Sequence, residues 1–303
     1  MIHGTILKHR QNPKVLVENK ISFAGPETEL CIYDTFEVAN RVKLQADQLL
    51  FCGMVTGKKV MHDEKDVYES PFLPHESFVM APKQVVEIDF PEAKLEQPTT
   101  CLAIEISVEK IKQVVEMLNR VNPLQEDYGY WQYDQTMLHT HHNSETQALL
   151  NRIVSIYTES HPDRSMLIDL AISELTVRLL REQTRQFIIK HSEETPDCNG
   201  LNAALFEIQK KLSAPLDIEH LCKLACMSRT KFFEQFKLHL GCTPVAYQQQ
   251  LRLKRAADLI KQGKQITHVC YDLGYVNASH FSRSFKQHYG LCPSEYKQRH
   301  FNN

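Results

Sequence analysis

The sequence predicts an α+β protein, with a β-rich N-terminal half and an all-α C-terminal domain. Short apolar and β-branched runs, separated by turn residues, fill about the first hundred residues and are typical of strands. Longer stretches with helical spacing follow, and the last hundred residues contain one helical motif twice. Many short strands before any long helix indicate a barrel or a sandwich. We therefore expect a β-barrel with helices, followed by an all-α domain.

Composition and length set the general class of the protein. The 303 residues are enough for two or three domains, and 42% hydrophobic against 24% charged residues is a globular balance. No apolar run approaches the roughly 20 residues of a membrane span, and the first residues lack the apolar core of a signal peptide. We expect a cytoplasmic protein that does not enter a membrane.

The N-terminal half shows strand and helix patterns without a diagnostic motif. Residues 49–62 are typical of a strand, a turn at Gly57 and a return strand. Residues 108–121 then change to helical spacing. The histidines His62 and His75 stand alone.

Catalytic and metal-binding residues are not indicated. The histidine cluster at 138–143 has no neighbouring cysteine or acid to complete a metal site. Nine cysteines without a CxxC pair argue against a disulfide framework. Cys222 and Cys226 would face one side of a helix, which allows a metal or redox role, but we interpret them as small packed side chains. We predict no catalytic residue, no metal and no cofactor, and hence no enzyme.

Two helices are expected before the C-terminal domain, at 144–160 and at about 163–191. The second has apolar residues on more than one side, with Ile168 and Ile172 on one and Leu170 on another. Such a helix packs against its own domain and against something else. A partner subunit is the natural candidate, although an internal core would produce the same pattern.

The charge of −2 hides a division of the chain. Residues 1–200 hold 20 Lys and Arg against 30 Asp and Glu, net −10, whereas residues 201–303 hold 15 against 7, net +8. The polar, acidic stretch 191–200, with Pro196 and Gly200, is the best linker between them. A small basic module behind an acidic one suggests that the C-terminal part meets a polyanion.

The repeated motif is the most informative feature. "KFFEQFKLHLG" at 231–241 returns as "HFSRSFKQHYG" at 280–290, and a short helix precedes each copy. The short helices lie 48 residues apart and the later matches 49, so the second copy has gained a residue at the bend. An insertion there is what a helix-turn-helix tolerates. The repeat predicts two such units, 218–241 and 266–290.

Caps and aromatic residues support this interpretation. Ser228 and Asn277 are placed to cap the second helix of each unit, and Gly241 and Gly290 to end it. Core residues stand at i, i+4 and i+8 in both helices: Phe232, Phe236, Leu240, Phe281, Phe285 and Tyr289.

The opposite faces of these helices carry polar side chains that can reach phosphates and base edges in a major groove. The predicted DNA-binding residues are Ser228, Arg229, Thr230, Lys231, Glu234, Gln235, Lys237, Asn277, Ala278, His280, Ser282, Arg283 and Lys286. They could also be mere polar faces of an all-α domain, but two matched copies with a basic excess weaken that reading. Between the copies, a helix over 244–262 would be roughly 28 Å long. It could hold both recognition helices on one side of a duplex, whose major grooves recur about every 34 Å.

The last hundred residues resemble the DNA-binding domain of AraC/XylS-type transcription regulators. "DLGYVNASHFSRSFKQHYGLCPSEYKQRH" and "MSRTKFFEQFKLHLGCTPVAYQQQLRLKRAADLI" carry the resemblance. One departure is Glu234, where the first unit of the family usually offers Arg. A carboxylate there repels phosphates but can accept from cytosine N4, so either the first helix reads an unusual half-site or Arg283 in the second dominates.

The resemblance implies a domain plan, partners and a function. It implies a cupin-like sensor domain in the N-terminal half, a small-molecule effector and no other cofactor, double-stranded DNA and a homodimer as partners, and RNA polymerase for an activator. The domains expected are 1–121 (β-rich sensor), 122–192 (helical dimerisation or linker region), 193–200 (linker) and 201–303 (DNA binding). A cupin-type enzyme or sensor whose helical tail serves another interaction stays open as an alternative, as does a regulator without a ligand.

Overall fold

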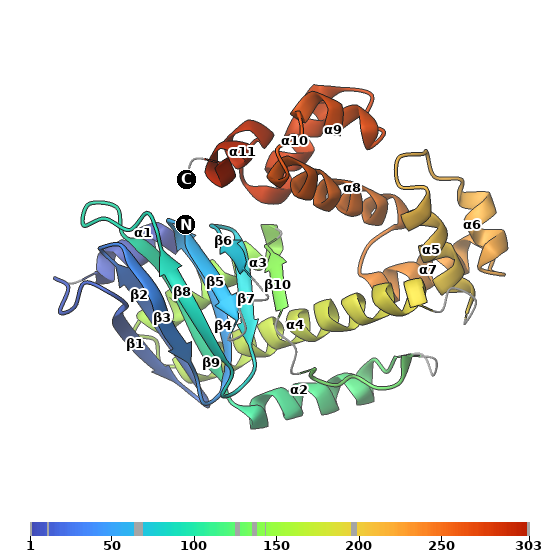
Figure 1. The fold of residues 1–303 in the computed structure, drawn as a ribbon. Coiled ribbons are helices and arrows are strands. Elements are labelled where there is room, and N and C mark those ends of the chain that lie inside the picture. Colours follow the sequence, from blue (N-terminus) through green and yellow to red (C-terminus); the bar gives the residue numbers. More distant parts are fainter. Residues whose placement is uncertain are drawn as a thin grey trace. The chain divides into compact units, whose positions relative to one another are not determined.

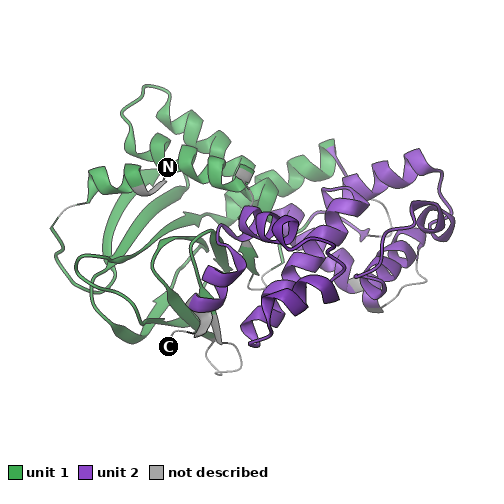
Figure 2. Cartoon of the chain, turned by 90° about the horizontal axis from the view of Figure 1, so that it is seen from above, with its two compact units in different colours: residues 1–121, 132–179 green, residues 122–131, 180–303 purple. Residues whose placement is uncertain are grey.

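The structure, a computed structural model, describes residues 2–10, 12–63, 69–124, 128–134, 138–142, 144–194 and 199–301. The chain forms two compact units (Figure 2). Residues 1–121 and 132–179 make up the first unit, and residues 122–131 and 180–303 the second. The expected linker at 193–200 falls partly on residues 195–198, which lie outside the described part of the chain.

The strands of the first unit form two antiparallel sheets (Figure 1). The larger sheet has the order β1-β2-β9-β4-β7-β10 and the smaller one the order β3-β8-β5-β6. Their bounds are β1 Asn19–Gly25, β2 Thr28–Thr35, β3 Ala39–Gln45, β4 Leu49–Thr56, β5 Lys59–Asp63, β6 Glu69–Phe72, β7 Glu76–Met80, β8 Val85–Phe90, β9 Thr99–Ile106 and β10 Leu138–His141.

Alternating side chains of the larger sheet enter two different cores. Leu30 and Ile32 of β2 join a core shared with helices, whereas Cys31 between them joins a core with residues of the smaller sheet, such as Ile88 and Phe90. The two sheets therefore face each other as a sandwich. The expected α+β class is confirmed, with two facing sheets in the place of a closed barrel among the described strands.

The expected return strand after Gly57 is present, but it does not pair with the strand before it. β4 pairs with β7 and β9 of the larger sheet, while β5 pairs with β6 and β8 of the smaller one. The chain thus crosses from one sheet to the other at Gly57, which has φ +82 and whose backbone lies close to Thr99. The alternation pattern of a strand identifies its buried face but not its neighbours, so it could not reveal this crossing.

The first unit also contains the helices α1 Ile2–His9, α2 Val108–Val121 and α3 Ser144–Thr158 and the N-terminal part of α4 Arg164–Glu194. The helices expected at 108–121, 144–160 and 163–191 are confirmed within two or three residues. Ile168 and Ile172 of α4 are buried in the core of the first unit, and Ile188 of the same helix in a core of the second. Leu170, on another side, remains 53% exposed.

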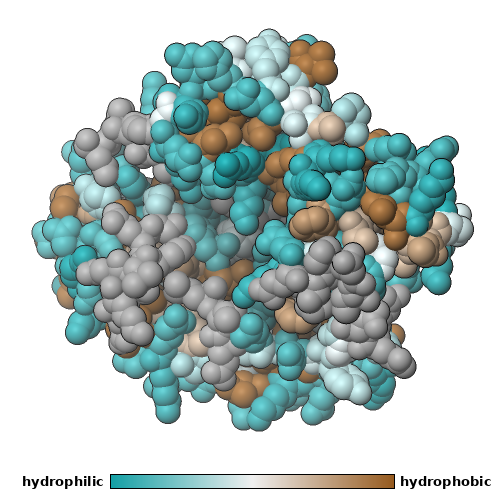
Figure 3. Space-filling model, turned by 45° about the vertical axis from the view of Figure 1, so that its right-hand side comes forward, coloured by the Kyte–Doolittle hydropathy of each residue, from teal (hydrophilic) through white to brown (hydrophobic). Residues whose placement is uncertain are grey.

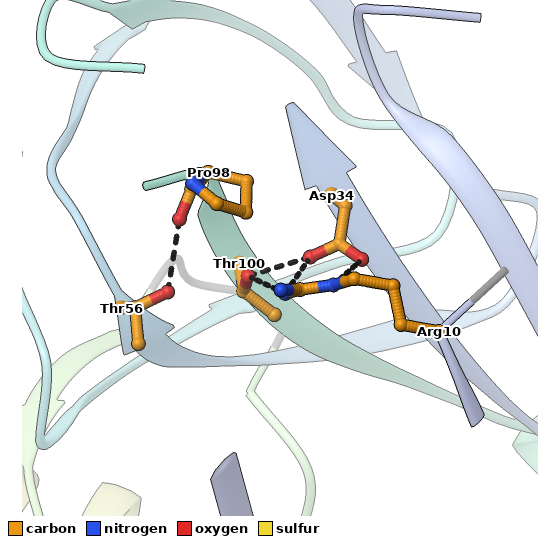
Figure 4. Close-up of polar contacts among 5 residues, drawn as sticks. All are labelled: Arg10, Asp34, Thr56, Pro98 and Thr100. Carbon is orange, nitrogen blue, oxygen red and sulfur yellow. Dashed lines mark hydrogen bonds and ion pairs between the residues drawn. The ribbon is translucent and has the colours of Figure 1, made fainter. Parts of the chain in front are cut away.

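A buried ion pair ties the residue after α1 to the larger sheet (Figure 4). The Arg10 guanidinium donates to both carboxylate oxygens of Asp34, at 3.0 and 2.8 Å, and to the hydroxyl of Thr100 at 3.1 Å. The Thr100 hydroxyl in turn donates to Asp34. Ile6 of α1 is buried in the helix-side core. The first helix is therefore held by a polar clamp and an apolar contact.

The second unit is helical. After the C-terminal part of α4 it contains α5 Gly200–Lys210, α6 Ile218–Leu224, α7 Arg229–Leu240, α8 Pro244–Lys261, α9 Ile266–Asp272, α10 Ala278–Tyr289 and α11 Pro293–Phe301. The expected all-α domain and both short helix pairs are confirmed. None of the described helices is long and apolar enough to cross a membrane.

Candidate nucleic-acid interface

The ends of α7 and α10 are built in the same way. The Ser228 hydroxyl accepts from the Lys231 amide at 3.4 Å, and the Asn277 side chain accepts from the Ser279 amide at 2.7 Å. Gly241 and Gly290 end the helices with φ of 70 and 73, in the left-handed region. All four predicted caps are confirmed. Each helix therefore starts and stops at a defined residue, which fixes the side chains that its outer face presents.

Aromatic side chains attach each of these helices to its own core. Phe232 and Phe236 are fully buried with ring centroids 5.6 Å apart, and Phe281 and Phe285 repeat the arrangement at 5.7 Å. The two pairs belong to separate clusters of buried residues. Each helix-turn-helix is thus a small packed body of its own, as the repeat predicts.

The connecting helix α8 contacts both bodies. The Phe236 ring lies 5.6 Å from Tyr247 near the N-terminal end of α8, and the Tyr289 hydroxyl donates to the Leu253 carbonyl at 3.3 Å farther along. At 18 residues, α8 is about 27 Å long. It joins the two helix-turn-helix bodies through packed side chains rather than through a loose loop.

Polar side chains of α8 also fix the loop that leads into α6. The Gln248 amide donates to the Ala214 carbonyl at 2.8 Å. The Arg252 guanidinium donates to the carbonyls of Leu212 at 2.7 Å and of Ala214 at 3.0 Å. Burial lowers the pKa of Arg252 from its ordinary value. These bonds link the loop before the first helix-turn-helix to the helix that leads to the second.

The predicted DNA-binding residues lie mainly on the outer faces of α7 and α10 or at their caps. Eleven of them are exposed: Ser228, Arg229, Thr230, Lys231, Glu234, Lys237, Asn277, Ala278, His280, Arg283 and Lys286. Gln235 and Ser282 are half-buried.

Three exposed residues of this surface were missed by the sequence prediction. Ser279 and Gln287 stand four residues before and after Arg283, on the same face of α10. The Arg283 guanidinium donates to the Ser279 carbonyl at 3.4 Å. Val276, just before the Asn277 cap, is 94% exposed. Spacing from Arg283 would have identified the first two.

The two outer faces differ in the kinds of charged group that they expose. Glu234 is exposed near the middle of α7, where the Arg229 guanidinium lies 5.9 Å from the ring centroid of Phe233. On α10 the exposed charges are Arg283 and Lys286, both positive. Because α7 also exposes Arg229, Lys231 and Lys237, each outer face has a net charge of +2 from these side chains. The faces differ in that α7 alone mixes a carboxylate with its cations.

One histidine of α7 is buried without a hydrogen-bond partner for either ring nitrogen among the described residues. His239 is 5% exposed, and its ring centroid lies 4.9 Å from that of Tyr128. Burial lowers the pKa of His239 to about 4. The imidazole is therefore neutral at ordinary pH, and this end of α7 packs as an apolar helix would.

The interior of the sandwich holds a second cluster of polar groups. The Lys59 ammonium, 3% exposed, contacts the Glu18 carboxylate at 3.1 Å and the Cys101 sulfur at 3.0 Å. It also lies 4.9 Å from the ring centroid of Phe90. Burial raises the pKa of the Cys101 thiol, so the Glu18 carboxylate is the counter-charge of the ammonium. A charged group inside an apolar core is costly unless it is paired.

Histidines of the cluster at 138–143, for which no metal site was expected, make hydrogen bonds to side chains of β7. The His139 ring bonds the Glu76 carboxylate at 3.0 Å, and His142 bonds the Ser77 hydroxyl. Within the described residues, the one group of three or more His, Cys, Asp and Glu side chains with ligand atoms close enough for a shared ion is Glu29, Cys31 and Glu105. Glu29 is already bonded to Lys20 at 3.0 Å.

Comparison with known proteins relates both units to one class. Residues 27–187 match the model of the AraC-type transcriptional regulator N-terminus, and residues 221–299 match that of a helix-turn-helix domain. An uncharacterized HTH-type transcriptional regulator of Haemophilus influenzae is 32% identical over 134 residues, or 44% of this chain and 45% of its own. The HTH-type transcriptional regulator AlkR of Acinetobacter baylyi is 30% identical over 175 residues, or 54% and 56%.

Among solved structures, an AraC-type DNA-binding domain protein from Chromobacterium violaceum is 28% identical. It covers 34% of this chain and 95% of that chain with a TM-score of 0.32. The alignments span about half the length, or less, of the curated relatives first matched. Those relatives are transcriptional regulators by name. Because the match to the N-terminal model extends over more than half of its 303 residues, the chain belongs to the family of AraC-type transcriptional regulators.

Proposed function

We propose that this protein is a cytoplasmic transcription regulator that binds double-stranded DNA sequence-specifically through α7 and α10. The observation that carries the proposal is that α7 and α10, both capped and both packed by aromatic side chains, expose polar faces and are joined by the single helix α8. The net charge of +8 over residues 201–303 favours a polyanion as partner.

Arg283 is the residue on which base recognition rests in this proposal. It is exposed at the centre of the outer face of α10, with Ser279 and Lys286 beside it. An arginine bidentate to a guanine contributes about 1–3 kcal/mol of discrimination. Lys286, one turn away, is placed for a phosphate instead.

The test is a comparison of specific and scrambled DNA, with the specific site obtained by selection from random duplexes. Arg283→Ala should weaken the specific site by about 1–3 kcal/mol and the scrambled one much less. Arg255→Ala removes an exposed arginine of α8, which lies outside both recognition helices. It should therefore change the affinity for both DNAs alike. Unchanged discrimination in Arg283→Ala would refute this role.

A homodimer is the proposed assembly. Met166 and Leu170 lie four residues apart on α4, 66% and 53% exposed, on the side away from the buried Ile168 and Ile172. Exposed apolar residues at helical spacing are typical of a subunit contact. Sedimentation of the wild type and of Leu170→Glu tests it. A wild-type monomer at micromolar concentration, with and without DNA, contradicts the assembly.

A small-molecule effector in the N-terminal unit is the proposed control. The buried Lys59 ammonium inside the sandwich supports this proposal. Ionisable groups in a perturbing, apolar environment are concentrated at binding and active sites. A thermal-shift screen with sugars, amino acids and aromatic acids should reveal a stabilising compound. Its stabilising effect should be lost in Lys59→Met, and an equal thermal shift in both proteins would place the compound elsewhere.

If the protein is an activator, RNA polymerase is a further proposed partner. Transcription in vitro with purified polymerase tests this contact.

A further inference from the structure

The turn of the first helix-turn-helix carries a thiol at a position that favours glycine. Cys226, between α6 and α7, has φ +51. The residue 48 positions later, at the same place in the second copy, is Gly274 with φ +78. The left-handed region is strained for any residue other than glycine. The first copy thus holds a sulfur atom where the second follows the ordinary backbone preference.

The hydrogen bonds of this turn bring two more sulfur-bearing residues beside Cys226. The Cys226 amide donates to the Lys223 carbonyl at 3.1 Å, and the Met227 amide to the Cys222 carbonyl at 3.0 Å. These two hydrogen bonds together form the Schellman motif, which ends a helix. In that motif the side chains at the positions of Cys222 and Met227 commonly touch.

All three sulfur-bearing residues line one surface hollow of about 470 Å³. Its seven lining residues are Ile218, Glu219, Cys222, Lys223, Cys226, Met227 and Arg229. Nine cysteines and eight methionines among 303 residues make three of seven a strong local enrichment. Cys226 is exposed, Cys222 and Met227 are half-buried, and both cysteines are free thiols. Solutes can therefore reach the cluster.

We propose that Cys222, Cys226 and Met227 form a binding site for a soft monovalent metal ion of the Cu(I) type. Thiolate and thioether ligands select Cu(I) over hard ions such as Mg²⁺ and Ca²⁺. Cys222 lies in the last turn of α6 and Cys226 in the left-handed turn that follows the helix, and both line the same hollow. Because both are free thiols, a metal ion held between the two sulfur atoms would join them.

Charge also favours this occupant. Binding releases the two thiol protons, so two thiolates and one monovalent ion carry a net charge of −1. Lys223 and Arg229 line the same hollow and can balance it, against the single carboxylate of Glu219. The second copy has Cys270, Gly274 and Tyr275 at the corresponding places, and Cys270 is fully buried. The site therefore belongs to the first helix-turn-helix alone and does not depend on the proposed DNA-binding function.

The experiment is an anaerobic Cu(I) titration of the full-length protein in competition with the chelator bicinchoninate, read by the ultraviolet thiolate-to-copper absorption. The wild type should bind a first equivalent with this absorption. Cys226→Gly removes a ligand and installs the residue of the second copy, so the fold should be kept or stabilised. We expect Cys226→Gly and Cys222→Ser each to lower the affinity by roughly tenfold or more. Met227→Leu, of similar volume, should lower it less.

The matched control is Cys292→Ser, which removes another half-buried thiol of the same unit and should bind like the wild type. An unchanged first equivalent in Cys226→Gly would overturn the proposal. So would a wild-type protein that leaves all of the Cu(I) with the chelator.

Discussion

Gly274 lies against the backbone of Ser213, so closely that a Cβ atom on Gly274 would be 2.0 Å from the Ser213 carbonyl oxygen. Gly274 belongs to the turn of the second helix-turn-helix, and Ser213 to the loop before the first. The same loop is held by Arg252 of α8 through two carbonyl groups. The contact between the two residues therefore joins both copies of the repeat.

Replacing Gly274 by alanine should destabilise the second unit strongly. The side chain meets backbone rather than a movable side chain, and φ +78 adds strain for any residue other than glycine. We expect a loss of about 3 kcal/mol or more, in the range of overpacking combined with backbone strain. Urea unfolding followed by the fluorescence of Trp131, the chain's one tryptophan and a member of the second unit, measures it.

Gly241→Ala is the matched control for that prediction. Gly241 has φ +70, but its Cβ would meet nothing within 4 Å. Only the strain of the left-handed backbone remains, about 1 kcal/mol. Equal losses in the two variants would show that the contact with Ser213 is not tight.

Acid should weaken the second unit through His239. Its pKa is about 4 in the folded chain against an ordinary value of 6.5, so the unfolded chain binds more protons between these values. The contribution of neutral His239 to the free energy of unfolding is fully present above about pH 6.5. It falls as the pH drops toward 4, by at most about 3 kcal/mol. The urea midpoint at pH 7 and pH 4.5 checks this.

His239→Leu should lose most of that pH dependence, because leucine fills the space without a titrating group. His288→Leu changes the half-buried residue at the same place in the second copy and should keep the wild-type dependence. A wild-type pH slope in His239→Leu contradicts the assignment.

Breaking the clamp on Asp34 should loosen α1. Asp34→Asn leaves the shape of the side chain but removes the charge that pairs with Arg10, in a site where the carboxylate is 1% exposed. Charge-assisted bonds of this kind contribute roughly 1.5–3 kcal/mol. Hydrogen exchange of the α1 amides should therefore accelerate by about tenfold or more.

An exposed ion pair on the same unit provides the comparison. Lys20 and Glu29 lie 3.0 Å apart with side chains 40% and 35% exposed. Solvent screens such a pair, so Glu29→Gln should change the exchange of α1 by little. If Asp34→Asn behaved like Glu29→Gln, Arg10 would not be what holds α1.

Local patterns in the sequence predicted the second unit closely. Caps and aromatic spacing depend on neighbouring residues alone, and Ser228, Asn277, Gly241 and Gly290 all take the expected places. The half-burial of Gln235 could not be anticipated from residue type, because a glutamine at the edge of a helix face has no distinct pattern. Ser279 was overlooked although its spacing from Arg283 was available.

Features that depend on distant parts of the chain were out of reach. The crossing at Gly57 depends on which strands pair, and a period of two residues carries no such information. The contact of Arg10 with Asp34 joins residues 24 apart, and that of Lys59 with Cys101 residues 42 apart. The thiol cluster was visible only as two cysteines with helical spacing, until the turn geometry placed Met227 beside them.

The central claim, that one chain reads two adjacent major grooves, is tested most directly by hydroxyl-radical footprinting on a selected DNA site. The account predicts two protected patches on one face of the duplex per protomer, about 10 base pairs apart. Lys231→Ala should weaken one patch and Arg283→Ala the other. A single patch, or two patches on opposite faces of the duplex, would contradict it.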